Sequence, residues 1–486
     1  MRTLLHAQEC REQDQRVAQQ LRISGFELMQ RAGQAATDIL VERWPEAARV
    51  SVLCGKGNNA GDGYLVATLA QRLGLIVQLI QVDPKPLEGD ADLARQLALR
   101  EGIVPCAADE RINGDVIVDA LLGTGLKGLL RAPYAEAVNQ INQHAAPVLS
   151  LDIPTGVATD TGAITGVAVV ADVTVTFIAD KIGLHTGAAL SCVGELLLRD
   201  LGAPRMVREV GIPLLFESDF LTAQIAPDAY KHARGYLLVI GGDHNMGGAP
   251  LLTAEAALRS GAGLVTVATR VEHRSAILAR RPELMVIDAE DQLMFKTLLE
   301  KADAIAIGPG LGTSQWARDL IHSVEVSGKP VLVDADGLRL WQRSQSATPV
   351  VLTPHMAEAA AMLGVPVSVV QADRMGAAAA LTERFGAAVI LKGPGSIVSL
   401  PRLTDVSLPE RLAATRLGIC GHGNPGMATA GMGDVLSGIS GALLAAGESA
   451  GYAAAYGMCL HSLCGDQAAK RRGQRAMLAS DVIDSL

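Results

Sequence analysis

The sequence is poor in aromatic residues and has no excess of positive charge. Phe, Trp and Tyr account for 3% of its 486 residues, which argues against an aromatic-rich β-sandwich. The 42 Lys and Arg residues are outnumbered by 51 Asp and Glu residues, for a formal net charge of −9. Such a chain has no broad cationic surface for a phosphate backbone or an anionic membrane. We therefore expect small-molecule ligands, with neither nucleic acid nor membrane as a partner.

Cysteine is also scarce. The seven Cys residues are odd in number, widely scattered and never spaced Cys-x-x-Cys, so the sequence indicates neither a disulfide framework nor a zinc site. Charged residues occur within the first dozen positions and interrupt the apolar region that a signal peptide needs. No later apolar run is a convincing membrane span. We expect a cytoplasmic protein with reduced, mostly buried thiols.

Glycine, in contrast, is abundant, with 51 residues. Short apolar runs alternate with segments of helical period along most of the chain, which predicts parallel sheets covered by helices. The alternation fails between about residues 202 and 234, where three prolines interrupt it, and resumes at Tyr236. We therefore predict two α/β domains, 1–215 and 230–486, joined by a linker over 216–229.

Three glycine-containing loops follow predicted strands of the first domain, at 54–63, 119–125 and 150–156. In an open parallel sheet, ligands lie beyond the carboxyl ends of the strands, so these loops can converge on one crevice. None of them has the spacing of a dinucleotide fingerprint or a P-loop. Taken alone, each loop could equally be a tight turn without a ligand.

The polar residues of these loops suggest a cation. Asn59, Asp119 and Thr155 offer only hard oxygen ligands, which favour an alkali or alkaline-earth ion over zinc or copper. The sequence therefore indicates a cation site among the loops of the first domain.

Together with residues 28–33 and 176–181, the loops resemble the N-terminal epimerase domain of the NAD(P)HX repair enzymes. The resemblance covers most of residues 1 to about 215. It implies a Rossmann-like three-layer sandwich that interconverts (R)- and (S)-NAD(P)HX, the hydrated forms of NADH and NADPH. It also implies that potassium binds Asn59, Asp119 and Thr155. The implied substrate site consists of Asn58, Asn59, Ala60, Gly61, Asp62, Gly123, Thr124, Gly125, Leu126, Lys127, Gly128, Leu129 and Asp152.

The sequence departs from the family pattern at two positions, and the family's reaction points to two residues that could transfer protons. Ala60 replaces a customary glycine, which would tighten the loop if its backbone needs a positive φ. Thr155 replaces a customary serine and keeps the hydroxyl. Epimerisation at a carbinolamine carbon requires acid and base steps, and Asp152 and Lys181 are the candidates for them. For Lys181, a solvated surface lysine at a strand end is the alternative.

A glycine-rich segment of the second domain, 429–438, places Asp434 near the start of a long predicted helix. Backbone N–H groups and the positive helix end can stabilise an anion there, and Asp434 can act as a base on a nearby hydroxyl. An N-cap aspartate without a ligand is the alternative. The loop 392–396 follows a predicted strand over 388–391 and offers a lysine to phosphate oxygens; a flexible loop without a ligand is its alternative.

Six motifs in the second half occur in an order that resembles the ADP-dependent (S)-NAD(P)HX dehydratase domain, a relative of the ribokinase-like kinases. They occupy residues 241–250, 259–265, 308–312, 333–338, 352–358 and 424–434. The resemblance covers about 230–486 and implies a ribokinase-like α/β/α fold. The implied pocket for the hydrated nucleotide contains Ala262, Gly310, His355 and Asp434. The implied ADP or AMP contacts are Lys392, Gly393, Pro394, Gly395, Ser396 and Gly433.

By this resemblance, Asp434 deprotonates the substrate hydroxyl as phosphate is transferred to it from ADP, leaving AMP. The phosphorylated intermediate then expels phosphate, which restores NAD(P)H from (S)-NAD(P)HX. Mg²⁺ is expected to bridge the nucleotide phosphates. For His355, the alternative to a place in the pocket is a role as a helix cap or a core histidine. Met432 stands where the family more often has Thr or Ser, and Ser396 where Thr is usual.

The leading hypothesis is therefore a bifunctional nicotinamide-nucleotide repair enzyme. A ribokinase-type small-molecule kinase, which would retain a phosphorylated product, is the second hypothesis. A binding scaffold that has lost catalysis is the third. The sequence leaves open ADP against ATP, NADHX against NADPHX, channelling between the sites and the oligomeric state, although a homo-oligomer is expected.

Overall fold

The computed structural model describes residues 2–126, 128–164, 166–203, 211–222, 227–342, 348–402 and 407–486. The chain divides into two compact units, Thr3–Gly211 and Ile212–Leu486, with the first two residues grouped with the second unit. None of the helices in the described ranges combines the length and apolar character of a membrane span.

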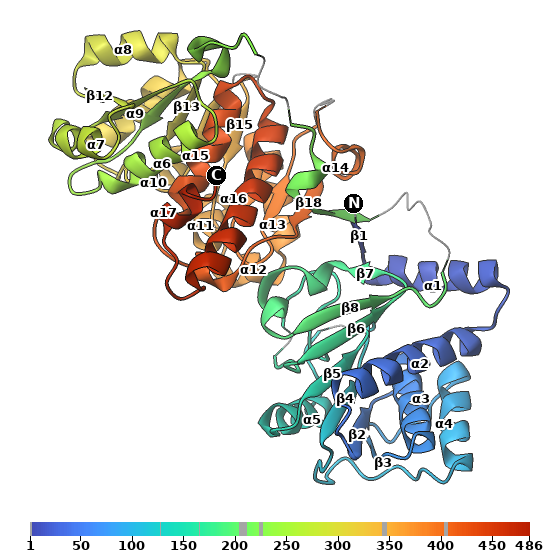
Figure 1. Ribbon diagram of the computed structural model, residues 1–486. Helices are drawn as coiled ribbons and strands as arrows, with labels where there is room; N and C mark the ends of the chain where they lie inside the picture. The colour runs from blue at the N-terminus through green and yellow to red at the C-terminus, as the bar shows by residue number, and fades with distance from the viewer. Residues whose placement is uncertain are drawn as a thin grey trace. The chain divides into compact units, whose positions relative to one another are not determined.

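The first unit is built on a six-stranded sheet in which all neighbouring strands are parallel (Figure 1). Its order is β3 (Ile76–Gln81), β2 (Arg49–Cys54), β4 (Val116–Ala120), β5 (Val148–Leu151), β6 (Val173–Phe177) and β8 (Glu195–Arg199). Three helices pack on one face and α5 (Ala132–Gln143) packs on the other. The three are α2 (Gly25–Arg43), α3 (Asn58–Arg72) and α4 (Gly89–Arg100). The expected three-layer α/β fold is confirmed.

The side-chain alternation of the strands explains this layering. Successive residues of a strand point to opposite faces, so Val52 packs with the α2–α4 layer and Leu53 packs with α5. Glycine lets α3 approach the sheet closely, because a Cβ on Gly63 would lie 2.5 Å from Ala120 Cβ and 2.8 Å from Cys54 Sγ. The start of α3 is thereby held against the ends of β2 and β4.

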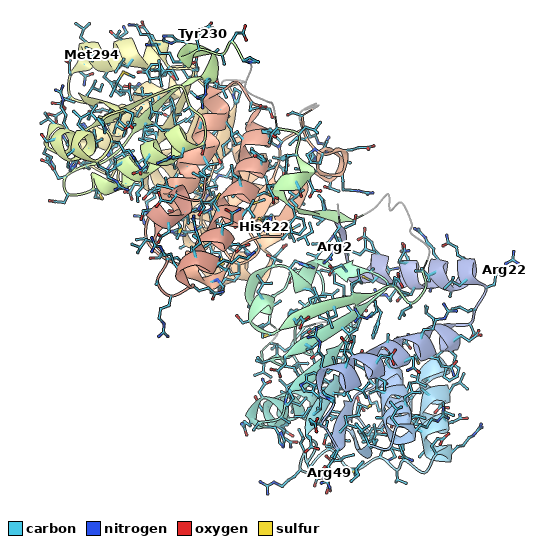
Figure 2. The ribbon with its side chains drawn as sticks, viewed as in Figure 1. Arg2, Arg22, Arg49, Tyr230, Met294 and His422 are labelled. Atoms are coloured by element: carbon cyan, nitrogen blue, oxygen red, sulfur yellow. The ribbon has the colours of Figure 1, made fainter. Side chains whose placement is uncertain are left out.

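The N-terminal segment also belongs to the structure around this sheet. Strand β1 (Arg2–Leu5) runs parallel to β7 (Asp180–Lys181), with Leu5 opposite Lys181. Helix α1 (Ala7–Leu21) follows and ends at Arg22, which adopts a left-handed conformation and is labelled in Figure 2. Residues 2–5 and 7–21 therefore form secondary structure, and β1 lies beside β7.

The second unit contains a larger sheet. Its strands lie in the order β12 (Met285–Asp288), β11 (Leu264–Thr269), β10 (Tyr236–Ile240), β13 (Ala304–Ile307), β14 (Val331–Val333), β15 (Val350–Leu352), β16 (Ala388–Leu391), β17 (Ile397–Ser399), β18 (Leu417–Cys420) and β9 (Ile212–Leu215). The strands from β12 to β16 are parallel, and β17 is antiparallel to both of its neighbours. The carboxyl ends of the parallel strands therefore share one edge.

Helices cover this sheet. The core on one side is formed with α6 (Gly248–Arg259), α15 (Met432–Ala445) and α16 (Ala450–Arg472), while α13 (Arg374–Phe385) packs against β16 and β17 (Figure 1). The other helices are α7 (Arg274–Arg280), α8 (Gln292–Lys301), α9 (Gln315–Glu325), α10 (Asp336–Leu340), α11 (Met356–Leu363), α12 (Val367–Ala372), α14 (Glu410–Thr415) and α17 (Ala479–Ile483).

Part of the segment that we expected to link the domains packs on the second unit. Phe220 is buried in its core, and its ring lies edge-on to that of Tyr452 with the centroids 5.8 Å apart. Tyr452 also donates a hydrogen bond to the carbonyl oxygen of Leu221. Part of the predicted linker thus contributes to the folded core of the second unit.

Candidate active sites

The three glycine-containing loops of the first unit lie together at the carboxyl edge of its sheet. The backbone N–H of Leu122 donates a hydrogen bond of 3.0 Å to Thr155 Oγ1, which joins the second loop to the third. A Cβ on Gly123 would lie 3.2 Å from Asp152 Oδ2 and 3.4 Å from Asn59 Cβ, which places the first loop beside the other two. The three loops therefore lie side by side at this edge of the sheet.

Asp119 is the buried carboxylate at the centre of these loops. Thr155 donates to it twice, from Oγ1 to Oδ1 at 2.8 Å and from its backbone N–H to Oδ2 at 2.9 Å. Ser150 Oγ and the backbone N–H of Leu121 donate at 2.9 and 3.2 Å. Burial raises the pKa of Asp119, although these hydrogen bonds oppose the shift. Its position is fixed by the backbone and side chains of two loops.

Asn59, the second residue of α3, is buried, yet its carboxamide has no hydrogen-bond partner among the described residues, at either Oδ1 or Nδ2. Leaving a buried amide unsatisfied is costly, so this side chain is suited to a ligand. Its oxygen and those of Asp119 and Thr155 are the donors that a hard monovalent or divalent cation prefers. The residues present therefore fit a potassium ion.

Asp152 and Lys181 form an ion pair, with Lys181 Nζ 2.6 Å from Asp152 Oδ1. Lys181 is 1% exposed and also donates to Thr176 Oγ1 at 2.6 Å, so the alternative of a surface lysine is wrong. Burial is the largest effect and opposes its charge, but Asp152, Cys10 and Asp14 together outweigh burial, and the pKa of Lys181 is raised. Asp152 has φ +67°, a strained backbone conformation for a non-glycine residue.

Two further carboxyl groups lie near this pair: Asp62, one of the predicted substrate-site residues, and Asp14, which was not anticipated from the sequence. Burial, the charge of Asp152 and that of Asp14 raise the pKa of Asp62 well above its usual range. Burial and the charge of Asp152 raise the pKa of Asp14 to about 7. Asp14 belongs to α1, where a helical period places it on one face with Cys10 and Val17. That periodicity was the available signal.

The remaining predicted epimerase residues divide into two groups. Asn58, Ala60, Gly61 and Asp62 lie in the first turns of α3, and the positive φ at its N-cap belongs to Gly57. Ala60 is helical and buried, so its replacement of glycine causes no strain. The second group leads away from Gly123 into solvent and comprises Thr124, Gly125, Leu126, Gly128 and Leu129, the last 79% exposed. Lys127 lies outside the described residues.

A buried ion pair also organises the site of the second unit. Lys392, just after β16, places Nζ 2.6 Å from Asp334 Oδ1, just after β14, and 4.0 Å from Glu358 Oε2. Ser437 Oγ of α15 donates to Asp334 Oδ2 at 2.7 Å. Burial raises the pKa of Asp334, but Lys392 outweighs burial and holds it below its usual range. Asp334 and Glu358 were not among the predicted site residues, although both lie within predicted motifs.

Asp434 lies in the first turn of α15, close to this ion pair. The N-cap of α15 is Gly431, with φ +86°, so the alternative that Asp434 is an N-cap is wrong. Burial, and then the charge of Asp334, raise the pKa of Asp434 to about 7, while Lys392 lowers it. A Cβ on Gly433 would lie 3.2 Å from Lys392 Nζ. The N-terminus of α15, the ammonium of Lys392 and the carboxyl group of Asp434 thus lie close together.

Arg374 of α13 supports the loop 392–396 through hydrogen bonds to its backbone. This arginine is buried, and its Nη1 donates to the carbonyl oxygens of Pro394 and Gly395, the latter at 3.0 Å. Gly393 has φ +135° and Gly395 has φ +58°, conformations that favour glycine. Ser396 Oγ donates to the carbonyl oxygen of Gly393 at 3.1 Å. The loop is therefore preformed, which does not favour the alternative of a flexible, unsupported loop.

The other predicted dehydratase residues are not all brought together. His355 caps α11, because its Nδ1 accepts from the backbone N–H groups of Ala357 and Glu358 at 3.1 and 3.2 Å. This agrees with the alternative of a cap histidine, and the side chain remains half exposed at the carboxyl edge, where its assignment to the pocket stays a prediction. Ala262, by contrast, precedes β11 at the opposite edge and is buried in the core. Its assignment to the pocket finds no support in this geometry.

Gly310 lies at the carboxyl edge, beside the loop that follows β10. A Cβ there would lie 2.8 Å from the carbonyl oxygen of Met246. A cavity of about 420 Å³ adjoins the same loop, and its lining includes Asn245, Gly248 and His273. Gly310 therefore packs against the loop that borders open space for a ligand.

His422 fixes the loop that precedes α15 (Figure 2). Its Nε2 lies 2.6 Å from Glu217 Oε2 and its Nδ1 lies 3.4 Å from Asp466 Oδ2. The hydrogen bond with Asp466, with a further contribution from Glu217, raises the pKa of His422 to about 9. Asp466 also accepts from Asn424 Nδ2 at 2.9 Å. A charged histidine thus ties this loop to α16.

Comparisons with known proteins match both units. Residues 25–183 match the family described as YjeF-related protein N-terminus, and residues 237–486 match the family described as NAD(P)H-hydrate dehydratase. The chain is 43% identical to the bifunctional NAD(P)H-hydrate repair enzyme Nnr of Coxiella burnetii, over 97% of this chain and 96% of that protein. It is 41% identical to the enzyme of the same name from Escherichia coli K12, over 100% and 93%.

Solved structures match the second unit. The ADP/ATP-dependent NAD(P)H-hydrate dehydratase of Bacillus subtilis, co-crystallised with ATP/Mg²⁺, is 26% identical with a TM-score of 0.50, covering 56% of this chain and 96% of that one. A ribokinase-like superfamily protein of Enterococcus faecalis is 28% identical with a TM-score of 0.50, covering 58% and 96%. The expected ribokinase-like fold is confirmed. With relatives matched over nearly their whole length, the chain belongs to the family of bifunctional NAD(P)H-hydrate repair enzymes.

Proposed function

We propose that this protein repairs hydrated nicotinamide nucleotides in two steps. The first unit interconverts (R)- and (S)-NAD(P)HX, and the second dehydrates (S)-NAD(P)HX to NAD(P)H while ADP is hydrolysed to AMP and phosphate. One observation carries the proposal: a single chain, similar over its whole length to bifunctional repair enzymes, contains a buried acid–base cluster in each of its two units. An epimerase joined to a dehydratase selective for one epimer leaves neither epimer unrepaired.

The first unit has the groups that epimerisation requires. The carbon that bears the hydroxyl is attached to the ring nitrogen, so it can invert by opening of the C–N bond and closure on the other face. The hydroxyl must lose a proton as the bond opens, and the nitrogen must gain one. Asp152, paired with Lys181 at 2.6 Å, is suited to accept the hydroxyl proton.

Potassium is the second part of the proposal for this unit. Asn59, Asp119 and Thr155 would hold the ion, and the buried, unpartnered carboxamide of Asn59 supports this assignment. The ion would supply positive charge beside Asp119 and the loops that face the substrate. Asn58, Asp62, Gly123 and the other predicted loop residues would bind the hydrated nucleotide around it.

In the second unit, Asp434 would remove the proton of the substrate hydroxyl as its oxygen attacks the terminal phosphorus of ADP and AMP departs. Phosphate then leaves with the C–O bonding electrons, the ring nitrogen supplies electrons to the carbon, and loss of a proton from the neighbouring carbon restores the dihydropyridine. Lys392 and the backbone N–H groups at the start of α15 would stabilise charge on the transferred phosphate. The loop 392–396 and Gly433 would contact the nucleotide.

Magnesium would assist this transfer through the nucleotide. The described residues include no group of three or more His, Cys, Asp or Glu side chains arranged to hold a metal ion. Magnesium commonly keeps several waters and binds mainly through phosphate oxygens, which agrees with this donor set. The ion would neutralise the phosphates that Lys392 and α15 face. A cytoplasmic location and a homo-oligomer remain predictions from the sequence.

The test uses the whole chain and both epimers of hydrated NADH, with ADP, Mg²⁺ and K⁺, and follows recovery of the dihydronicotinamide absorbance. We expect full conversion by the wild type, none by Asp434→Asn, and conversion of the (S)-epimer alone by Asp152→Asn. Exposed aspartates provide matched controls: Asp319→Asn on α9 and Asp38→Asn on α2 should both behave as the wild type.

Two further measurements distinguish repair from the alternative functions. Free phosphate should appear in equal amount to the recovered dihydronucleotide, whereas a stable phosphorylated product would favour a ribokinase-type kinase. Absence of recovery with both ADP and ATP would contradict the repair function. Comparing the two nucleotides and the two substrates in this assay also determines the preferences that the sequence leaves open.

A further inference from the structure

Helix α1 packs one face against the residues that lead into Lys181. Cys10 forms a buried cluster with Leu5 and Ala179, and Val17 packs with Ile178. Asp14 is four residues after Cys10 and three before Val17, so it lies on this same inward face. The strand pairing of Leu5 with Lys181 holds the start of α1 in place. Asp14 is therefore directed toward the epimerase site from outside the loops that define it.

Charge counting shows that the resulting cluster must retain protons. Asp14 and Asp152 interact with the ammonium of Lys181, and Asp62 interacts with both of these carboxyl groups. The Cys10 thiol, whose pKa burial raises to about 12, is neutral. Three ionised carboxylates around one buried ammonium would carry a net charge of −2 in a poorly solvated place, which is unfavourable. The pKa of Asp62 is raised well above its usual range by burial and by the charges of Asp152 and Asp14, so Asp62 keeps its proton and Asp14 is left to exchange one.

We propose that Asp14 is a further functional residue of the epimerase site, which releases a proton when Asp152 accepts one and recovers it when Asp152 is restored. Before ring opening, Asp152 is a carboxylate and Asp14 a neutral acid. After Asp152 takes the hydroxyl proton, Asp14 becomes the carboxylate that balances Lys181. The proton that Asp14 releases reaches the ring nitrogen through water, and ring closure reverses both transfers. The net charge of the cluster is the same before and after.

This role deepens the proposed epimerase function and depends on it. Because Asp14 passes its proton through water and does not itself touch the substrate, its test needs a readout that a purely structural change does not alter. The pH profile of epimerisation is such a readout. Asp14 must be protonated at the start of ring opening, and burial together with the charge of Asp152 raises its pKa to about 7. The epimerisation rate should therefore fall as pH rises through about 7.

The experiment measures interconversion of the purified epimers by the full-length protein without ADP, so that no dehydration takes place. For Asp14→Asn we expect a rate at least about tenfold lower at pH 6 and no decline between pH 6 and 8. Asp14→Glu should retain a decline. Glu12→Gln, on the exposed face of the same helix, is the matched control and should keep the wild-type profile. Dehydration of pure (S)-epimer should be unchanged in all three.

Several results would overturn the proposal. An Asp14→Asn protein with the wild-type rate and profile excludes the role. If Asp14→Asn does not fold, as judged by its melting curve, the wild-type profile decides, because a flat rate from pH 6 to 8 also excludes it. Absence of epimerisation by the wild type is a different result, which contradicts the epimerase function itself.

Discussion

The ammonium of Lys392 lies 2.6 Å from Asp334 Oδ1, and Gly433 packs directly against the pair. A Cβ on Gly433 would lie 3.2 Å from Lys392 Nζ and 3.3 Å from Asp334 Oδ2, which are tight contacts. The first turn of α15 therefore lies close to both charges. Any group bound at this helix end would be in the field of Lys392.

Replacing Lys392 with Met should abolish most of the dehydratase activity and destabilise the second unit. The substitution leaves Asp334 buried without its cation, which costs about 3–5 kcal/mol, and removes charge stabilisation worth at least about 100-fold in rate. Lys296→Met on the exposed face of α8 is the control. Melting curves and (S)-epimer turnover test this, and an active, stable Lys392→Met protein would contradict it.

The dehydratase rate should depend on the ionisation of Asp434. Its pKa is raised to about 7, so the carboxylate needed as a base is depleted below that pH, and kcat/KM should rise from pH 5.5 to 8 and then level off. The same shift means that folding favours the protonated form, so stability is lost as pH rises through about 7. Asp434→Asn should therefore be inactive yet melt no lower than wild type at pH 8. A lower melting temperature there would argue against the raised pKa.

Arg374 should affect nucleotide binding without touching the transferred phosphate. Replacing it with Met removes the buried, charged donor to Pro394 and Gly395, at about 1.5–3 kcal/mol for each hydrogen bond lost. We expect the KM for ADP to rise at least about tenfold, a change of about 1.4 kcal/mol, with a smaller effect on kcat. Arg384→Met, exposed on the same helix, is the comparison. Equal KM values for the two variants would show that the loop does not depend on Arg374.

Stimulation of the epimerisation rate by potassium should require the Thr155 hydroxyl. Thr155→Val keeps the shape of the side chain but removes the group that donates to Asp119 at 2.8 Å, and such changes around a metal ligand typically weaken binding by about 10–100-fold. Epimerisation should then lose its stimulation by potassium chloride over choline chloride, whereas Thr155→Ser should keep it. If the wild type itself is indifferent to the cation, the proposed ion site has no functional role.

Local patterns in the sequence were sufficient for the two parallel sheets and for the loops at their carboxyl edges. The alternation of apolar runs predicted the strands, and the glycines that follow them marked the turns into helices, as at Gly57 before α3 and Gly431 before α15. The glycine-rich segment 429–438 indicated Asp434, and the resemblance to known repair enzymes added Asp152. These residues lie within contiguous motifs, which is why they could be identified without coordinates.

Contacts between distant segments could not be predicted in this way. Asp334 meets Lys392 across 58 positions of sequence, and nothing local to either residue indicates the other. Likewise, Lys181 resembled a surface lysine until its burial and its pairing with Asp152 were known. Ala262 illustrates the opposite error, because its motif is shared with the family although the residue itself lies at the far edge of the sheet.

The pairing of Leu5 with Lys181 has a practical consequence for anyone who divides this protein into parts. The family match for the first unit starts at residue 25, after both β1 and α1. A fragment that starts at this boundary would retain all six strands of the parallel sheet and could melt cooperatively. It would nevertheless lack the strand beside Lys181 and the helix that carries Asp14, so a well-folded fragment would be a poor measure of what the intact epimerase unit can do.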